Sequence, residues 1–192
     1  MASVVLLRGV NVGGNRTFRP AILAAQLSHC DVVNIGAAGT FVVRKAVAQE
    51  QLLEEFRQRL PFKTDIIIVE GSDIAGIMRD HPFHDQELTP DVTRFVSFLT
   101  RLPESEPVMP FEFPESGSWV VRILARKDRF IYGIYRRDMK AISYLGRLDK
   151  RFGVPLSTRN WNTIAAIARV LDAPVTPSPE EATENGCNHP AR

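Results

Sequence analysis

Apolar residues in the first half of the chain recur at two spacings, which predict alternating strands and helices. Short apolar runs favour strands, and apolar positions three or four residues apart favour helices. The predicted strands are 3–8, 31–35, 40–44 and 65–70, and the predicted helices are 20–28, 47–60 and a short one from Ser72 or Asp73 to about Arg79. This order is that of the split β-α-β, or ferredoxin-like, plait, an antiparallel sheet with its helices on one face.

The second half repeats the order in a degraded form. Its predicted strands are 92–99, 118–124, 129–135 and 154–158, and its predicted helices are 142–152 and a last one from Asn160 or Asn162 to Leu171. Four prolines from 103 to 114 predict an irregular crossover there. We therefore expect an α+β protein of two ferredoxin-like subdomains, 1–85 and 86–172, each an antiparallel sheet with helices on one face. Residues 173–192, rich in proline, serine, threonine and glutamate, predict a disordered tail.

Chain length and cysteine content indicate the number of domains and the cellular compartment. The 192 residues fit one large domain or two small ones. Cys30 and Cys187 are too few and too far apart for a disulfide framework, so we expect reduced thiols in a cytoplasmic protein. The only apolar run before Arg8 is four residues long, Val4 to Leu7, which predicts neither a signal peptide nor a membrane span.

Charge is unevenly distributed along the chain. Residues 122–159 hold eleven lysines and arginines against three aspartates. Such an excess favours an anionic partner, nucleic acid included. The alternative is a solvated face that keeps the protein soluble, and the sequence leaves both interpretations open.

A glycine-rich loop with an arginine at each end follows the first predicted strand. Its candidate ligand-binding residues are Arg8, Asn11, Gly13, Gly14 and Arg16. Glycines allow a ligand to approach the backbone closely, and amides before a helix hold phosphate or carboxylate. The loop lacks the Lys-Ser/Thr that completes a nucleotide-binding P-loop. The alternative is a glycine turn that only joins a strand to a helix.

A second candidate motif precedes the last predicted helix. It comprises Arg159, Asn160, Trp161 and Asn162. Arginine can bind an anion with two hydrogen bonds, tryptophan can stack on a ring, and asparagine can donate a hydrogen bond. The alternative is a helix start with a core tryptophan. Because both motifs are loop-to-helix starts with arginine and asparagine, we hypothesise that they face one another across the subdomain cleft and form one site.

The stretches 7–14 and 158–163 together resemble the bacterial domain-of-unknown-function family 1697, over about residues 3–171. The resemblance implies a pair of plait-like α+β subdomains and no established activity. The chain departs from the family pattern at three places, namely Asn15-Arg16 where a lysine is usual, Ala38-Gly39-Thr40 where Ser-Gly-Asn is frequent, and Arg136-Arg137-Asp138-Met139-Lys140 where a small, basic start is favoured.

Few other residues of the sequence suggest a metal site or a catalytic group. His81 and His84 flank a proline without a third metal ligand, so capping roles in a linker fit them better. We expect no metal and no cofactor. The sequence thus favours a cytoplasmic protein that binds a small anionic, phosphate- or nucleotide-like ligand, or nucleic acid, at the inter-subdomain cleft. The alternatives are an enzyme on a nucleotide-like substrate, with no recognisable catalytic group, and a partner-binding or homodimerisation module.

Overall fold

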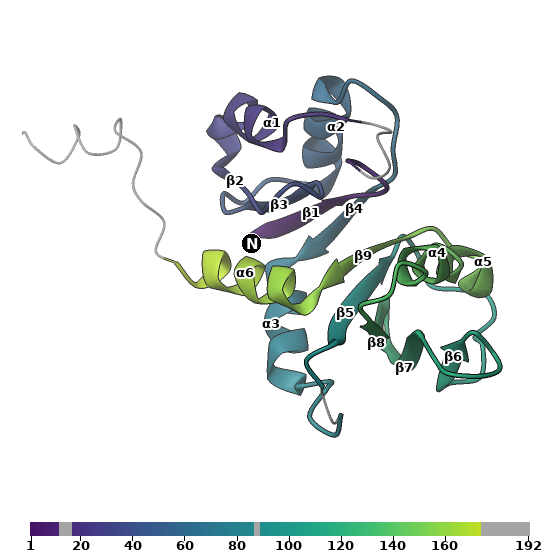
Figure 1. The fold of residues 1–192 in the computed structure, drawn as a ribbon. Helices are drawn as coiled ribbons and strands as arrows, with labels where there is room; N and C mark the ends of the chain where they lie inside the picture. The colour runs from purple at the N-terminus through teal and green to yellow at the C-terminus, as the bar shows by residue number, and fades with distance from the viewer. Residues whose placement is uncertain (12–16, 87–88, 174–192) are drawn as a thin grey trace, which may run out of the picture.

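The structure, a computed structural model, describes residues 1–11, 17–86 and 89–173, which form two antiparallel sheets with helices (Figure 1). The strands are β1 (Ser3–Leu7), β2 (Val32–Asn34), β3 (Thr40–Val43), β4 (Ile66–Glu70), β5 (Val92–Leu99), β6 (Phe111–Phe113), β7 (Val121–Lys127), β8 (Phe130–Arg136) and β9 (Leu156–Asn160). The helices are α1 (Pro20–Gln26), α2 (Gln49–Arg59), α3 (Gly71–Asp80), α4 (Ala141–Leu145), α5 (Leu148–Phe152) and α6 (Trp161–Asp172). The protein is therefore of the α+β class, and the predicted tail at 174–192 lies outside the described residues.

The first sheet has the strand order β2-β3-β1-β4. Its central strand β1 pairs with β3 and β4, which places Val5 opposite both Phe41 and Ile68. All five residues of β1 are buried, because Val4 and Leu6 face one apolar cluster while Val5 and Leu7 face another. A strand that is apolar on both sides needs cover on both faces of its sheet.

The second sheet has the order β6-β7-β8-β5-β9. Strand β6 lies in the proline-rich segment for which the sequence predicts no regular structure, and it pairs with β7 at the edge of the sheet. Prolines are tolerated beside an edge strand because one side of that strand needs no hydrogen-bond partner. The irregular crossover expected at 103–114 therefore contains a short strand that periodicity did not indicate.

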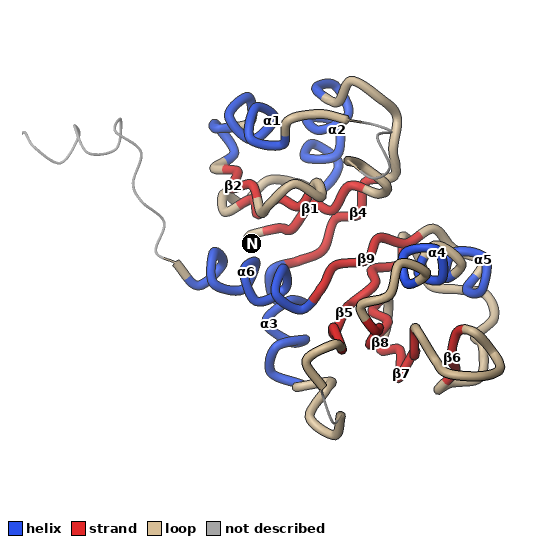
Figure 2. The backbone as a smooth tube through the Cα atoms, in the orientation of Figure 1, coloured by secondary structure: helices blue, strands red, loops and turns tan. Residues whose placement is uncertain are grey.

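Three apolar clusters hold the layers together (Figures 1 and 2). One cluster joins α1 and α2 to one face of the first sheet, and another joins α4 and α5 to one face of the second sheet. The central cluster contains both remaining sheet faces together with α3 and α6, through residues such as Ile74 and Ile167. The expectation of helices on one face only is thus wrong for the first sheet, whose two faces are both covered. It is also wrong for the second sheet, where α3 and α6 cover part of the face opposite α4 and α5.

Two local features lie near the candidate functional site described below. The single helix predicted at 142–152 is divided into α4 and α5 around Gly146, a poor helix former. At the start of α6, the Asn160 side chain accepts a hydrogen bond of 2.8 Å from the backbone nitrogen of Thr163 and caps the helix.

Among the described helices, none is long and apolar enough to cross a membrane.

Candidate functional site

A pocket of about 410 Å³ opens where the end of β1 meets β9 and the α4–α5 pair. Its walls are Leu7, Arg8, Gly9, Val10, Ala38, Leu145, Gly146, Asp149, Leu156, Ser157, Thr158 and Arg159. The pocket therefore contains one arginine from each of the two sequence motifs. Its volume is within the usual range for small-molecule sites, about 300–1,000 Å³.

Arg159 is a buried cation that joins the two sheets. It lies on β9 opposite Val96 of β5, and its side chain reaches the first sheet. Its Nε donates to the Thr40 hydroxyl at 2.6 Å, and its Nη1 donates to the Ser157 hydroxyl and the Thr158 carbonyl, both at 2.8 Å. Its Nη2 donates to the carbonyls of Leu7 (3.0 Å), Ala38 (2.8 Å) and Gly39 (3.2 Å).

These acceptors satisfy the five N–H groups of Arg159 but do not neutralise its charge. None of its partners among the described residues is a carboxylate. Burial lowers the pKa of Arg159 to about 10, because desolvation disfavours the charged form. That value is still well above neutrality, so the side chain is a cation at pH 7.

Arg8, in contrast, is paired with two carboxylates. Its Nη1 lies 3.1 Å from Asp65 Oδ2, and its Nη2 contacts Asp149 Oδ2. Burial acts to lower the pKa of Arg8, but hydrogen bonding by Asp149 and the charges of Asp149 and Asp65 raise it above its ordinary value. About a third of the Arg8 side chain is exposed (34%), so a ligand can reach it from the pocket.

Asn11 closes the loop after β1. Its Nδ2 donates to the carbonyls of Phe18 (3.2 Å) and Ala37 (2.7 Å), and its Oδ1 accepts from the Phe18 nitrogen at 3.0 Å. A positive φ of 54° at Asn11 is a conformation that asparagine adopts more readily than most residues. Asn11 thus shapes the loop, whereas Gly13, Gly14 and Arg16 lie outside the described residues.

The other three residues of the second motif, Asn160, Trp161 and Asn162, do not line this pocket. Asn160 caps α6, and Asn162 is exposed on that helix. Trp161 lines a separate hollow of about 180 Å³ with Met78, His81, Phe83, His84 and Arg94. Its ring packs against Phe83, with 5.1 Å between the ring centroids. The structure brings Arg8 and Arg159 together, and it places Trp161 in a different hollow.

Three charged residues of these two sites were not predicted from the sequence. Asp65 and Asp149 became partners of Arg8 only through the approach of α5 and β4 to β1. Arg94 carries a weak sequence signal, since it occupies an inward position of β5 between Val92 and Val96. A charged residue in an apolar face is unusual, and it marks where that face is not fully covered.

A family model described as "Protein of unknown function (DUF1697)" matches residues 1–127 of the chain, about two thirds of its length. The chain belongs to this family. The matched residues of the DUF1697 protein include Arg8 and Asp65, whereas Asp149, Arg159 and Trp161 lie beyond them. The predicted family is confirmed over residues 1–127, which include the first motif but not the second, and it assigns no activity.

The DUF1697 chain is also similar to a solved structure, that of the conserved bacterial protein SP0830 from Streptococcus pneumoniae. The two share 17% sequence identity with a TM-score of 0.57, over 89% of this chain and 98% of that one. This likeness shows a common fold. No curated protein matches the sequence.

Proposed function

We propose that the protein binds a small ligand with an anionic, phosphate- or nucleotide-like group in the pocket between the sheets. The observation that carries this proposal is Arg159, a buried cation on the pocket wall with no carboxylate partner among the described residues. Its neutral hydroxyl and carbonyl acceptors solvate the positive charge but do not neutralise it, so the charge of Arg159 still produces a positive electrostatic potential in the pocket.

The field of Arg159 acts at close range and with little screening. Two unit charges about 8 Å apart interact by roughly 2 kcal/mol at an effective dielectric constant of about 20. Because all five N–H groups of Arg159 already have acceptors, this residue would attract an anion through its charge rather than through new hydrogen bonds. Its role would be electrostatic.

Arg8 is the residue that would contact the anion. Its guanidinium is partly exposed and is shared between Asp65 and Asp149. A ligand anion would replace Asp149, whose Oδ1 also accepts a hydrogen bond from the Leu156 nitrogen at 3.2 Å. Asp149 would therefore compete with the ligand, and its charge would set the affinity.

A thermal-shift screen tests this function with inorganic phosphate, nucleotides and phosphosugars at constant ionic strength. A ligand at about 100 times its Kd stabilises the folded protein by about 2.7 kcal/mol, a rise in Tm of roughly 5–10 °C at this chain length. We expect Arg8→Gln to abolish the shift. Asp149→Asn should increase the affinity, because it removes the competing charge while an oxygen acceptor for Leu156 remains.

Arg44→Gln is the matched control. Arg44 is also a partly buried arginine paired with an aspartate, Asp31 at 2.8 Å, but it does not line this pocket. Its substitution should leave the ligand shift unchanged. A ligand that stabilises Arg8→Gln as much as the original protein, or that binds Asp149→Asn more weakly, would contradict the proposed site.

We also propose that each half is a ferredoxin-like subdomain, with the division near residue 85. Support comes from the strand orders, because β2-β3-β1-β4 is the plait order with α1 after β1 and α2 after β3. In the second half, β7-β8-β5-β9 repeats these neighbours, with α4 and α5 between β8 and β9 and β6 as an added edge strand.

A cytoplasmic location is likewise a proposal. Its support is Cys30, a buried free thiol with only 3% of its surface exposed. Burial and the charge of Glu55 raise the pKa of this thiol, which disfavours the reactive thiolate. Such a cysteine is typical of a protein in a reducing compartment.

A further inference from the structure

Three arginines occupy one end of the central-cluster face of the second sheet. Arg94 of β5 and Arg122 of β7 both lie opposite Ile134 of β8. Arg94, Ile134 and Arg122 therefore form a row across the sheet. Partners in an antiparallel pair share a face, and Arg136 lies two residues beyond Ile134 on the same side. Arg94 and Arg122 are therefore separated by two strand spacings, about 10 Å.

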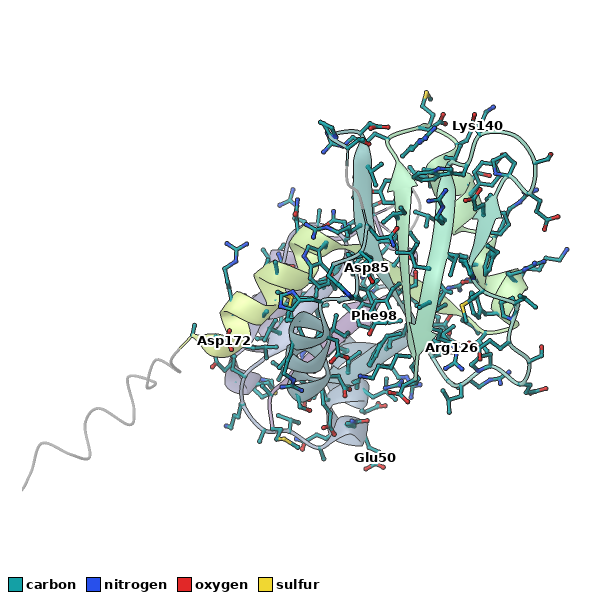
Figure 3. All side chains as sticks on the ribbon, turned by 90° about the horizontal axis from the view of Figure 1, so that it is seen from below. Glu50, Asp85, Phe98, Arg126, Lys140 and Asp172 are labelled. Carbon is teal, nitrogen blue, oxygen red and sulfur yellow. The ribbon has the colours of Figure 1, made fainter. Side chains whose placement is uncertain are left out.

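This end of the face is not covered by helices. Farther along the same strands, Val96, Phe98, Phe130 and Tyr132 are buried under α3 and α6. At the arginine end, Arg94 and Arg122 are half-buried and Arg136 is exposed. In Figure 3 helices α3 and α6 lie beside the part of the strands near Phe98, and the strand ends near Lys140 extend beyond these two helices. Ile134 between Arg94 and Arg122 is nevertheless buried, so solvent reaches the arginine side chains and not the strand beneath them.

Aromatic rings hold the three guanidiniums. Arg122 and Arg136 each lie 4.5 Å from the ring centroid of Trp119. Arg94 lies 5.6 Å from the ring centroid of Trp161 and 5.9 Å from that of Phe83. A guanidinium stacked on a ring keeps its N–H groups free around its edge, where they can bind phosphate with two hydrogen bonds. We name this surface, Arg94, Arg122, Arg136, Trp119 and Trp161, the arginine–tryptophan face.

The charges on this face are only partly compensated. Arg122 pairs with Glu112 at 2.6 Å, and Arg136 interacts with the charge of Asp91 without forming an ion pair or hydrogen bond with it. The guanidinium of Arg94 contacts only aromatic rings among the described residues. At the opposite end of β7, Arg126 and Lys127 are both paired, with Glu106 and Asp80. The basic excess of residues 122–159 is thus paired with carboxylates at one end of the sheet and only partly compensated at the other.

We propose that the arginine–tryptophan face binds single-stranded nucleic acid. Phosphates would lie between Arg94, Arg122 and Arg136, and unpaired bases would stack on the outer guanidinium planes and on the exposed part of Trp161. The hollow beside Trp161, about 180 Å³, is smaller than a site for a whole small molecule and is lined by rings and Arg94. An acidic peptide would satisfy the charges, but it has no planar rings to stack on this surface. This face is separate from the pocket of the proposed function.

Fluorescence anisotropy of the full chain with a labelled oligouridylate of about 12 nucleotides tests the proposal. The test variants are Arg94→Gln/Arg136→Gln and the charge-retaining Arg94→Lys/Arg136→Lys. The control is Arg57→Gln/Lys63→Gln, which removes two exposed charges from the first half of the chain. Thermal melting of the control should be unchanged, because Arg57 and Lys63 have no hydrogen bond or ion pair to lose within the described residues. The glutamine variant should melt several degrees lower and still fold, because it loses cation–π contacts worth about 0.5–1 kcal/mol each.

We expect the Kd of Arg94→Gln/Arg136→Gln to rise at least tenfold. The slope of log K against log salt should become flatter by about 1.4, since each lost phosphate contact removes about 0.7 for a single strand. The lysine variant should keep the slope and still bind more weakly, because lysine lacks the stacked planar fork. Both tryptophans of the chain flank the face, so intrinsic fluorescence should change on binding.

Other results would overturn the proposal. An equal loss of affinity in the Arg57→Gln/Lys63→Gln control, or a salt slope that the glutamines do not change, would mean non-specific attraction. Binding of polyglutamate with the same affinity and the same sensitivity to Arg94 and Arg136 would assign the face to an acidic protein partner. Binding that Arg8→Gln abolishes while Arg94→Gln/Arg136→Gln does not would locate the nucleic acid in the pocket. Absence of binding at about 50 mM salt would refute it outright.

Discussion

At the scale of single residues, Arg159 is the most constrained side chain of the candidate site. It is 6% exposed, and its donors reach the end of β1, the turn before β3 and its own strand. The turn contributes Gly39, whose φ is 65° and whose Cβ, if present, would lie 2.9 Å from Cβ of Leu7. Sequence reasoning selected Arg159 as a ligand-binding residue, but four of its six hydrogen-bond partners came from segments more than a hundred positions away.

We expect Arg159→Met to destabilise the protein by about 3 kcal/mol or more, since it leaves several buried carbonyl and hydroxyl groups without donors. Arg159→Lys should recover little of this loss, because three ammonium donors cannot serve six acceptors in the same geometry. Urea unfolding with a constant m-value measures both effects. Arg57→Met, on the exposed side of α2, is the control and should change stability by less than about 0.5 kcal/mol.

At the scale of elements, periodicity located most strands and helices to within a few residues, because it reports which face of a segment is buried. Strand β5 was predicted with the bounds that it has, Val92–Leu99. Strand β6 was missed, because a three-residue edge strand between prolines has too little pattern to detect. The helix predicted at 142–152 is two short helices, and this division places Asp149 against Arg8.

Two glycines give a matched test of the elements. A Cβ at Gly133 of β8 would clash with the Phe95 ring and would lie 2.7 Å from the Arg122 carbonyl oxygen. A Cβ at Gly76 of α3 would meet only Arg79 Nη2, at 3.8 Å. We expect Gly133→Ala to cost about 1–3 kcal/mol and Gly76→Ala to stabilise α3 by about 0.5–1 kcal/mol. Thermal melting of both variants is the measurement, and a Gly133→Ala protein as stable as the original would show that β8 and β5 are less tightly packed than described.

At the scale of the whole molecule, the central cluster decides how the two halves behave. It contains Val4 and Leu6 from the first sheet, Phe98 and Tyr132 from the second, and Ile167 from α6. Separation of the sheets would expose apolar residues of both, so the halves stabilise each other. The proposed boundary near residue 85 would therefore separate sequence units that share one core.

We expect urea unfolding to be one transition, with the same midpoint by far-ultraviolet circular dichroism and by tryptophan fluorescence. Phe98→Ala, which leaves a cavity in the central cluster, should lower the stability by about 3–5 kcal/mol. The two probes should still coincide in that variant, because the shared core couples the sheets. Two separate midpoints in the original protein would mean that the halves unfold independently.

The sequence by itself determined the local structure and the family. Apolar spacing predicted most of the strands and helices, and the two motifs indicated the family. Asn160, one of the two residues predicted to begin the last helix, is its cap. The tertiary structure alone decided that Arg8 meets Asp149, that Trp161 lies beside Arg94 and apart from Arg159, and that both faces of the first sheet are covered. The reason is that spacing along a chain encodes which side of a segment is buried, whereas the partner on that side depends on how distant segments pack together.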